Sequence, residues 1–152
     1  MAAMMGGRAS KRIQKELEKF QTEASDDGLT LEVVSDTVWQ ISFIGAPGTV
    51  YEGEPYTLRL RFTDDYPMDS PEVVFLTPAP AHHHVYSNGH ICLNILADDW
   101  SPALTAKSIV LSILSMMSSA TEKGLPPDNE IYTAGARKNP KNTRFVFHDD
   151  TV

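Results

Sequence analysis

The amino-acid sequence predicts an α+β fold with a helix, an antiparallel meander of about four strands and a second helix, in that order. Two periodicities carry this prediction: apolar residues repeat at helical spacing near residues 13 and 110, and they alternate with polar residues in between. A third observation is that residues 77–100 show little periodicity. Long segments with scant regular structure are often functional, so the candidate site is sought there.

Residues 10–21 are predicted to form the first helix. Ile13, Leu17 and Phe20 share one face of this helix, because they recur at intervals of four and three. A stripe of basic side chains lies well away from that face and consists of Arg8, Arg12, Lys15 and Lys19. The stripe is either a solvated face that keeps the helix soluble or a surface for an acidic protein partner.

Four segments are predicted to be the strands of the meander. They are residues 29–34, 38–44, 56–62 and 73–76. The third is the clearest, because apolar residues from Tyr56 to Phe62 alternate with polar ones and so give one buried and one wet face. In the second strand, Trp39, Ile41 and Phe43 lie on one side in the same way.

A central helix is predicted at residues 105–119, where Ile109, Val110 and Ile113 belong to a wide apolar face that we assign to the core. The region after this helix ends at two adjacent prolines. The tail, residues 122–152, is weakly patterned, so we expect irregular or short-helical structure and leave open whether it is partly mobile. The chain has no internal repeat, linker or second domain in its pattern.

Composition excludes several classes of function. The formal charge of −7 argues against nucleic-acid binding, and no apolar run approaches the ~20 residues of a membrane helix. Residues 1–10 lack the apolar stretch of a secretory signal, and a single cysteine cannot form an internal disulfide. We therefore expect a protein of the reducing cell interior, in the cytoplasm, the nucleus or both.

The single cysteine, Cys92, lies in the irregular segment and follows four histidines, His82, His83, His84 and His90. A lone cysteine is most often a small buried hydrophobe, and this interpretation competes with a catalytic one. Imidazoles nearby could orient a substrate, donate hydrogen bonds or relay protons, which favours catalysis.

A zinc site built from His82, His84, His90 and Cys92 is a rival interpretation. It lacks a Cys-x-x-Cys or His-x₃-His pair, and adjacent histidines usually cannot all face one ion, so we expect no metal. A hydrolase triad that uses Cys92 is less supported still, because nothing marks an oxyanion turn.

Two motifs, residues 87–93 (Ser-Asn-Gly-His-Ile-Cys-Leu) and residues 100–104 (Trp-Ser-Pro-Ala-Leu), resemble the active-site signature of ubiquitin-conjugating enzymes. Upstream, Tyr66-Pro67 and Pro71 resemble the loop that precedes the last strand in that family. The resemblance covers roughly residues 10–121. It implies the ubiquitin-conjugating fold and a single catalytic domain over residues 1–152.

The chain is most similar to the W-type branch of this family. It has His84 eight residues before the cysteine, where most members have the asparagine of His-Pro-Asn. The tail also resembles this branch, at residues 126–129 (Pro-Pro-Asp-Asn), 139–141 (Asn-Pro-Lys) and 148–151 (His-Asp-Asp-Thr). His83 replaces the usual proline, and this departure bears on the rigidity of the loop because histidine does not fix φ.

The resemblance implies that an activating enzyme, which uses ATP, hands the C-terminal carboxyl of ubiquitin to Cys92 as a thioester, with no bound cofactor. His84 occupies the position of the family's oxyanion donor and is interpreted either as that donor or as a loop organiser. His82 and Asn94 complete the candidate site. A noncatalytic module that binds ubiquitin or ligases, and conjugation of another ubiquitin-like modifier, remain open alternatives.

Two acids that the resemblance would place near the cysteine are absent. Asn94 stands at the first position, and Gly124 falls near the second, with Glu122 close by. A lysine amine has a pKa of ~10.4 and an α-amine one of ~7.7–8.0, so far more of the α-amine is neutral near pH 7. An enzyme with weak means of deprotonating lysine would favour protein N-termini, the preference for which W-type enzymes are known.

The resemblance also implies partner surfaces. The activating enzyme would meet the first helix at Arg8, Lys11, Arg12 and Lys15. Ubiquitin ligases would meet two loops at Met68, Pro102 and Ala103. The expected partners are thus ubiquitin, its activating enzyme, ubiquitin ligases and protein substrates with exposed N-termini, with no nucleic acid and no membrane.

Overall fold

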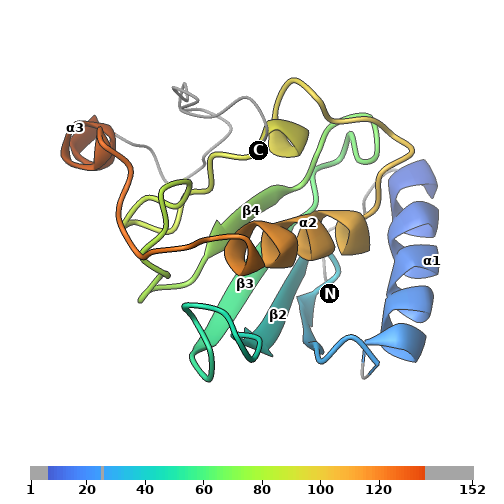
Figure 1. The fold of residues 1–152 in the computed structure, drawn as a ribbon. Helices are drawn as coiled ribbons and strands as arrows, with labels where there is room; N and C mark the ends of the chain where they lie inside the picture. The colour runs from blue at the N-terminus through green and yellow to red at the C-terminus, as the bar shows by residue number, and fades with distance from the viewer. Residues whose placement is uncertain (1–6, 25, 136–152) are drawn as a thin grey trace.

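A computed structural model of the chain describes residues 7–24 and 26–135. Its elements run in the predicted order, with a short third helix near the end (Figure 1). They are α1 (Gly7–Glu23), β1 (Thr30–Ser35), β2 (Val38–Ile44), β3 (Pro55–Arg61), β4 (Glu72–Phe75), the 3₁₀ turn η1 (Asn94–Leu96), α2 (Ala106–Ser118) and α3 (Asn129–Gly135). Figure 1 shows α2 lying across one face of the sheet, with α1 and α3 at opposite ends of the molecule.

The sheet is the predicted antiparallel meander, in the order β1-β2-β3-β4. Trp39 pairs with Leu60 and Leu58 pairs with Phe75, so apolar side chains of three strands face the same layer. The opposite face carries polar pairs, such as the hydroxyls of Ser42 and Thr57 at 2.9 Å. The alternation seen in the sequence therefore separates a core face from a wet face.

Helix α2 covers the core face of the sheet. Its buried side chains are Ala106, Ile109, Val110, Ile113 and Met117. Thr105 caps the helix, because its hydroxyl accepts from the backbone N–H of Ser108 at 3.0 Å while the Ser108 hydroxyl accepts from the N–H of Thr105. This reciprocal cap fixes where the central helix begins, at the predicted boundary.

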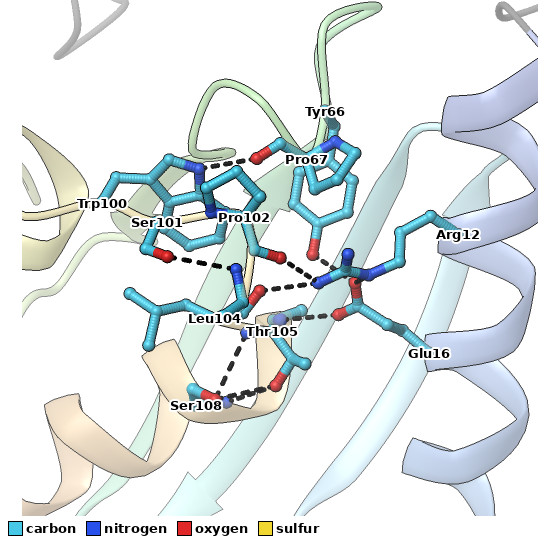
Figure 2. A network of polar contacts seen from close by, with 12 residues as sticks. Arg12, Glu16, Tyr66, Pro67, Trp100, Ser101, Pro102, Leu104, Thr105 and Ser108 are labelled. Atoms are coloured by element: carbon cyan, nitrogen blue, oxygen red, sulfur yellow. Dashed lines mark hydrogen bonds and ion pairs between the residues drawn. The ribbon is translucent and has the colours of Figure 1, made fainter.

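A partly buried polar network ties α1 to the start of α2 (Figure 2). The Glu16 carboxylate accepts hydrogen bonds from the Arg12 Nε at 2.7 Å, from the backbone N–H of Ala106 at 2.7 Å and from the Tyr66 hydroxyl. Arg12 also donates to the carbonyl oxygens of Pro102 and Leu104, both at 2.8 Å. The carboxylate thus satisfies a helix N-terminal N–H that would otherwise have no partner.

The short-helical tail is confirmed for residues 129–135, which form α3. Residues 136–152, including the two later tail motifs, lie outside the described residues. Across the part of the chain that the structure describes, no helix combines the length and the apolar character needed to cross a bilayer.

Candidate active site

The irregular segment around Cys92 is anchored to the edge of the sheet. The backbone N–H of Phe75, at the end of β4, donates to the carbonyl oxygen of Gly89 at 2.9 Å. Gly89 has φ +93°, and a Cβ there would lie 2.1 Å from the carbonyl oxygen of Phe75, so only glycine fits this close approach. The N–H of Cys92 in turn donates to the carbonyl oxygen of His84 at 2.8 Å. These hydrogen bonds hold the stretch that contains His82, His83 and His84, and the stretch that contains His90, next to Cys92.

The sulfur of Cys92 is covered. The residue is 1% exposed and belongs to a small buried cluster with Tyr86 and Tyr132. Burial, and secondly the charge of Asp128, raise the pKa of the Cys92 thiol to about 11. The thioester chemistry that the family resemblance implies needs a sulfur open to an incoming carboxyl, and the expectation of an open sulfur is wrong for the conformation described, because Tyr132 of α3 packs in the cluster that buries Cys92.

The buried His82 side chain contacts backbone groups of the active-site loop and of α2 through both ring nitrogens. Its Nδ1 accepts from the backbone N–H of His84 at 2.9 Å, and its Nε2 lies 3.2 Å from the carbonyl oxygen of Met116 on α2. The ring is therefore neutral with the proton on Nε2, and burial lowers the pKa of His82 to about 4. Both ring nitrogens are engaged within the protein, which fits a positioning role better than a catalytic one.

His84 and Asn94 flank the cysteine without being deeply buried. The His84 ring lies 5.5 Å from the His82 ring, centroid to centroid, and lines a cleft of about 600 Å³. Leu93, the neighbour of Cys92, lines the same cleft, as do Ser115 of α2 and Glu122. Asn94 begins the turn η1 and is half-buried. His84 thus lines the cleft beside Leu93 and is bonded to Cys92 through its backbone carbonyl oxygen, and its two predicted roles stay predictions.

His83 and Gly124 fit one another. A Cβ at Gly124 would lie 2.6 Å from Nε2 of His83, so the missing side chain leaves room for the imidazole. The side chain of an acidic residue at position 124 would come into contact with the His83 ring. The acid that influences the thiol is instead Asp128, whose carboxylate accepts from the Tyr86 hydroxyl at 3.2 Å. Sequence reasoning missed Asp128, although it quoted the Pro-Pro-Asp-Asn motif that contains it.

The zinc interpretation gains no support from the geometry. Within residues 7–24 and 26–135, no group of three or more His, Cys, Asp or Glu side chains is arranged to hold a metal ion. His82 uses both ring nitrogens on backbone groups, as described above. His82 therefore has no ring nitrogen left for a metal in this conformation.

The family model described as "Ubiquitin-conjugating enzyme" matches residues 12–146. The chain belongs to the ubiquitin-conjugating enzyme family. It is 48% identical to "Ubiquitin-conjugating enzyme E2 W" of Caenorhabditis elegans, over 97% of this chain and 100% of that protein. It is 51% identical to "Probable ubiquitin-conjugating enzyme E2 W-A" of Danio rerio, over 93% of this chain and 96% of that protein.

The solved structures agree with the sequence relatives. The crystal structure of the ubiquitin-conjugating enzyme E2 UbcA1 of Agrocybe aegerita has a TM-score of 0.84 and 41% identity, over 90% of this chain and 100% of that one. The ubiquitin-conjugating fold, the family and the similarity to the W-type branch are therefore confirmed. This result favours an enzyme over the noncatalytic module that the sequence had left open.

The basic side chains on α1 of this ubiquitin-conjugating enzyme fall into two groups, those bound to other groups of the protein and those exposed to solvent. Lys11 and Lys15 are exposed on α1, whereas Arg12 is bound to Glu16 and to two carbonyl oxygens. The side chain of Arg8 lies outside the described residues. Lys11 and Lys15 are thus the described basic residues of the predicted surface that remain available for a partner.

The two loops predicted to meet ligases are joined in the enzyme. The indole N–H of Trp100 donates to the carbonyl oxygen of Pro67 at 2.8 Å, which ties the loop after β3 to the loop before α2. Met68 is 68% exposed, and Pro102 and Ala103 are exposed on the second loop. The three predicted contact residues therefore lie on connected loops.

Proposed function

We propose that Cys92 is the thioester nucleophile through which this ubiquitin-conjugating enzyme passes ubiquitin to protein α-amines. The observation that carries the proposal is the placement of Cys92 between the histidine-lined cleft and α3, with its backbone N–H bonded to His84. Its sulfur would attack the carbonyl carbon of ubiquitin held by the activating enzyme. A new C–S bond forms, the activating enzyme's thiolate leaves, and the Cys92 proton passes to solvent.

The second step transfers the acyl group to an amine. A neutral amine attacks the thioester carbonyl, its nitrogen loses a proton to solvent, the tetrahedral oxyanion collapses to an amide, and the C–S bond breaks as the Cys92 thiolate leaves. His84 supports this step either by donating a hydrogen bond to the oxyanion from the cleft or by holding the loop through its backbone. ATP is used upstream by the activating enzyme, so the proposal needs no cofactor bound to this chain.

The proposed preference for α-amines follows from the side chains beside the sulfur. Asn94 and Gly124 supply no carboxylate, and Gly124 faces the His83 ring. At pH 7 roughly a tenth of α-amines is neutral, against roughly one lysine in a few thousand. A site with little means of deprotonating lysine therefore acts mainly on the amine that is already neutral. Two carboxylates could weaken this preference: Glu122, which lines the cleft, and Asp128, whose charge raises the pKa of the Cys92 thiol.

A charging assay tests the proposal. The enzyme is incubated with activating enzyme, ubiquitin and ATP, and the product is separated with and without reductant. We expect a reductant-sensitive adduct that Cys92→Ala does not form. Discharge is then timed against a peptide with a free α-amine and against its N-acetylated lysine-containing counterpart. Equal discharge rates would contradict the N-terminal preference, and a charged Cys92→Ala variant would contradict the nucleophile.

His84→Ala separates the two roles of that residue. Loss of an oxyanion donor should slow discharge about tenfold or more and leave charging much less affected. Normal discharge at all pH values would leave only the role of loop organiser. The same charging assay with other ubiquitin-like modifiers and their activating enzymes tests whether ubiquitin is the modifier carried.

The proposed activating-enzyme surface is tested on the free side chains of α1. Lys11→Glu combined with Lys15→Glu should slow charging about tenfold at low salt, because the basic stripe then repels an acidic partner. Arg61→Glu is the matched control, since Arg61 is an exposed basic residue on β3. Equal charging by the double variant and the control would remove the assignment.

A further inference from the structure

The cover over Cys92 comes from one short segment. Helix α3 has seven residues, and its only buried side chain is Tyr132, which is 8% exposed. The Tyr132 ring stacks on the Tyr86 ring with centroids 3.7 Å apart and planes 15° apart. Tyr86 is fully buried and shares a cluster with Cys92 and Tyr132. A single aromatic side chain of α3 thus packs over the residues that surround the sulfur.

Polar contacts hold the same segment to the loop that carries the cysteine. The Tyr132 hydroxyl lies 2.8 Å from Nδ1 of His90, which is 4% exposed. Asn129 and Ser87 exchange two hydrogen bonds: the Ser87 backbone N–H donates to Oδ1 at 2.8 Å, and Nδ2 donates to the Ser87 Oγ at 3.0 Å. The Tyr86 hydroxyl donates to the Asp128 carboxylate. These contacts of residues 128–132 all reach residues 86–90.

Geometry sets a requirement on the proposed reaction. Thioester formation needs the carbonyl carbon of a protein chain to reach bonding distance of the sulfur, and a residue 1% exposed leaves no room for that approach. The segment that blocks the approach has one buried side chain, Tyr132, and its other described contacts are hydrogen bonds made by Asp128 and Asn129, of which those of Asn129 are exposed. Elements with few buried contacts open at low free energy without unfolding the rest of the protein.

We propose that residues 128–135 form a lid that closes Cys92 in the uncharged enzyme, with Tyr132 as the closing side chain, and that the lid must lift for ubiquitin to be loaded. The proposal rests on the function proposed for Cys92. In the closed state the lid protects the thiol from small electrophiles and oxidants. In the open state Tyr132 leaves Tyr86, and the sulfur faces the incoming carboxyl group.

The test measures the access of a small reagent to the sulfur, which does not depend on ubiquitin. Cys92 is the single cysteine, so the rate of alkylation by iodoacetamide at pH 7.5 reports on it alone. Tyr132→Ala should raise this rate about tenfold or more, because it removes the cover and the burial that disfavours the thiolate. Tyr132→Phe keeps the stacked ring and loses the contact with His90, so its rate should rise less.

Ile131→Ala is the matched control, because Ile131 lies next to Tyr132 on α3 and is 83% exposed. Its alkylation rate should equal that of the wild type. Equal rates for Tyr132→Ala and Ile131→Ala would overturn the lid. If Tyr132→Ala fails to fold, Asn129→Ala removes two of the lid's hydrogen bonds from the surface, and an unchanged rate in that variant would overturn the proposal as well.

Charging assays on the same variants keep the two proposals distinguishable. Rapid alkylation of Tyr132→Ala combined with faster charging supports both the lid and the nucleophile. Rapid alkylation with no ubiquitin adduct on any variant contradicts the function proposed for Cys92 and leaves the lid standing. An unchanged alkylation rate with normal charging contradicts the lid and leaves the function standing.

Discussion

Helices α1 and α3 lie at opposite ends of the molecule and are held in different ways (Figure 1). Helix α1 buries Ile13 and Phe20 in the main core and is tied to α2 by Glu16, whose side chain is 9% exposed. Helix α3 is held by Tyr132 and by hydrogen bonds to a loop. The first end is built as part of the folded core, whereas the second can separate from it.

This difference has a functional meaning within the proposals made above. A helix that presents Lys11 and Lys15 to a partner needs a fixed position, and the Glu16 network supplies it. A segment that covers a nucleophile must be able to leave. Substitutions at each end test whether α1 and α3 differ in their contribution to the free energy of unfolding as they differ in their contacts.

The largest effect on stability is expected at the fixed end. Glu16→Ala should lower the free energy of unfolding by about 2–4 kcal/mol, because it leaves the Arg12 guanidinium, the Tyr66 hydroxyl and the Ala106 N–H without their shared acceptor. Urea denaturation measures this change. Glu18→Ala is the control, since Glu18 is exposed on the same helix and its carboxylate accepts a single long contact among the described residues, from Gln14 at 3.4 Å.

Tyr132→Ala provides the comparison at the other end. It should cost about 1–2 kcal/mol in the same titration, less than Glu16→Ala, since α3 opens without the core and a tenfold gain in access to Cys92 corresponds to about 1.4 kcal/mol. A loss as large as that of Glu16→Ala would show that α3 unfolds together with the rest of the protein, and the contrast between the two ends would be lost.

The buried thiol should make stability depend on pH. Its pKa is about 11 in the folded state against an ordinary value of 9.0, so the folded state holds the proton more tightly. The resulting stabilisation is fully present below pH 9 and is lost as the pH rises through 11, by about 2 kcal/mol for this group at pH 11. Cys92→Ala should lack this component, and the difference between the two pH profiles measures it. Profiles that stay parallel from pH 8 to pH 11 would contradict the burial.

Asp128→Asn should have a smaller effect on the reactivity of Cys92. The charge of Asp128 adds to the rise in the pKa of the thiol, and asparagine keeps an acceptor for the Tyr86 hydroxyl without that charge. The pKa should fall, so alkylation at pH 7.5 should speed up about two- to fivefold. Asp98→Asn is the control, an exposed acid on the loop after η1. A rate equal to that of the control would remove Asp128 from the electrostatics of the site.

The smallest effect is expected at Gly124. Gly124→Ala brings a Cβ to 2.6 Å from Nε2 of His83, and the exposed His83 side chain can swing away. The free energy of unfolding should change by about 0.5 kcal/mol or less. A loss above about 2 kcal/mol would show that the His83 ring is held in place and that it stiffens the loop in the absence of the usual proline.

Much of the fold was predictable because its signals are local. Alternation predicted β2 with the bounds that the structure has, and the helical repeat predicted α2 between its caps, Thr105 and Ser119. For α1 the prediction began three residues late and ended two residues early, since helix ends carry weaker signals than the apolar face. The family resemblance placed Cys92, His82, His84 and Asn94 on one loop, where the structure also has them.

The sequence by itself determined the order of the elements, the core faces and the motif around Cys92, because periodicity and short motifs depend on neighbours along the chain. Only the tertiary structure decided that Arg12 serves the α1–α2 junction, that Asp128 acts on the thiol and that Tyr132 covers it. Those facts depend on residues 36 or more positions apart meeting in space. No spacing in a single sequence records such meetings, since they are set by the packing of the whole chain.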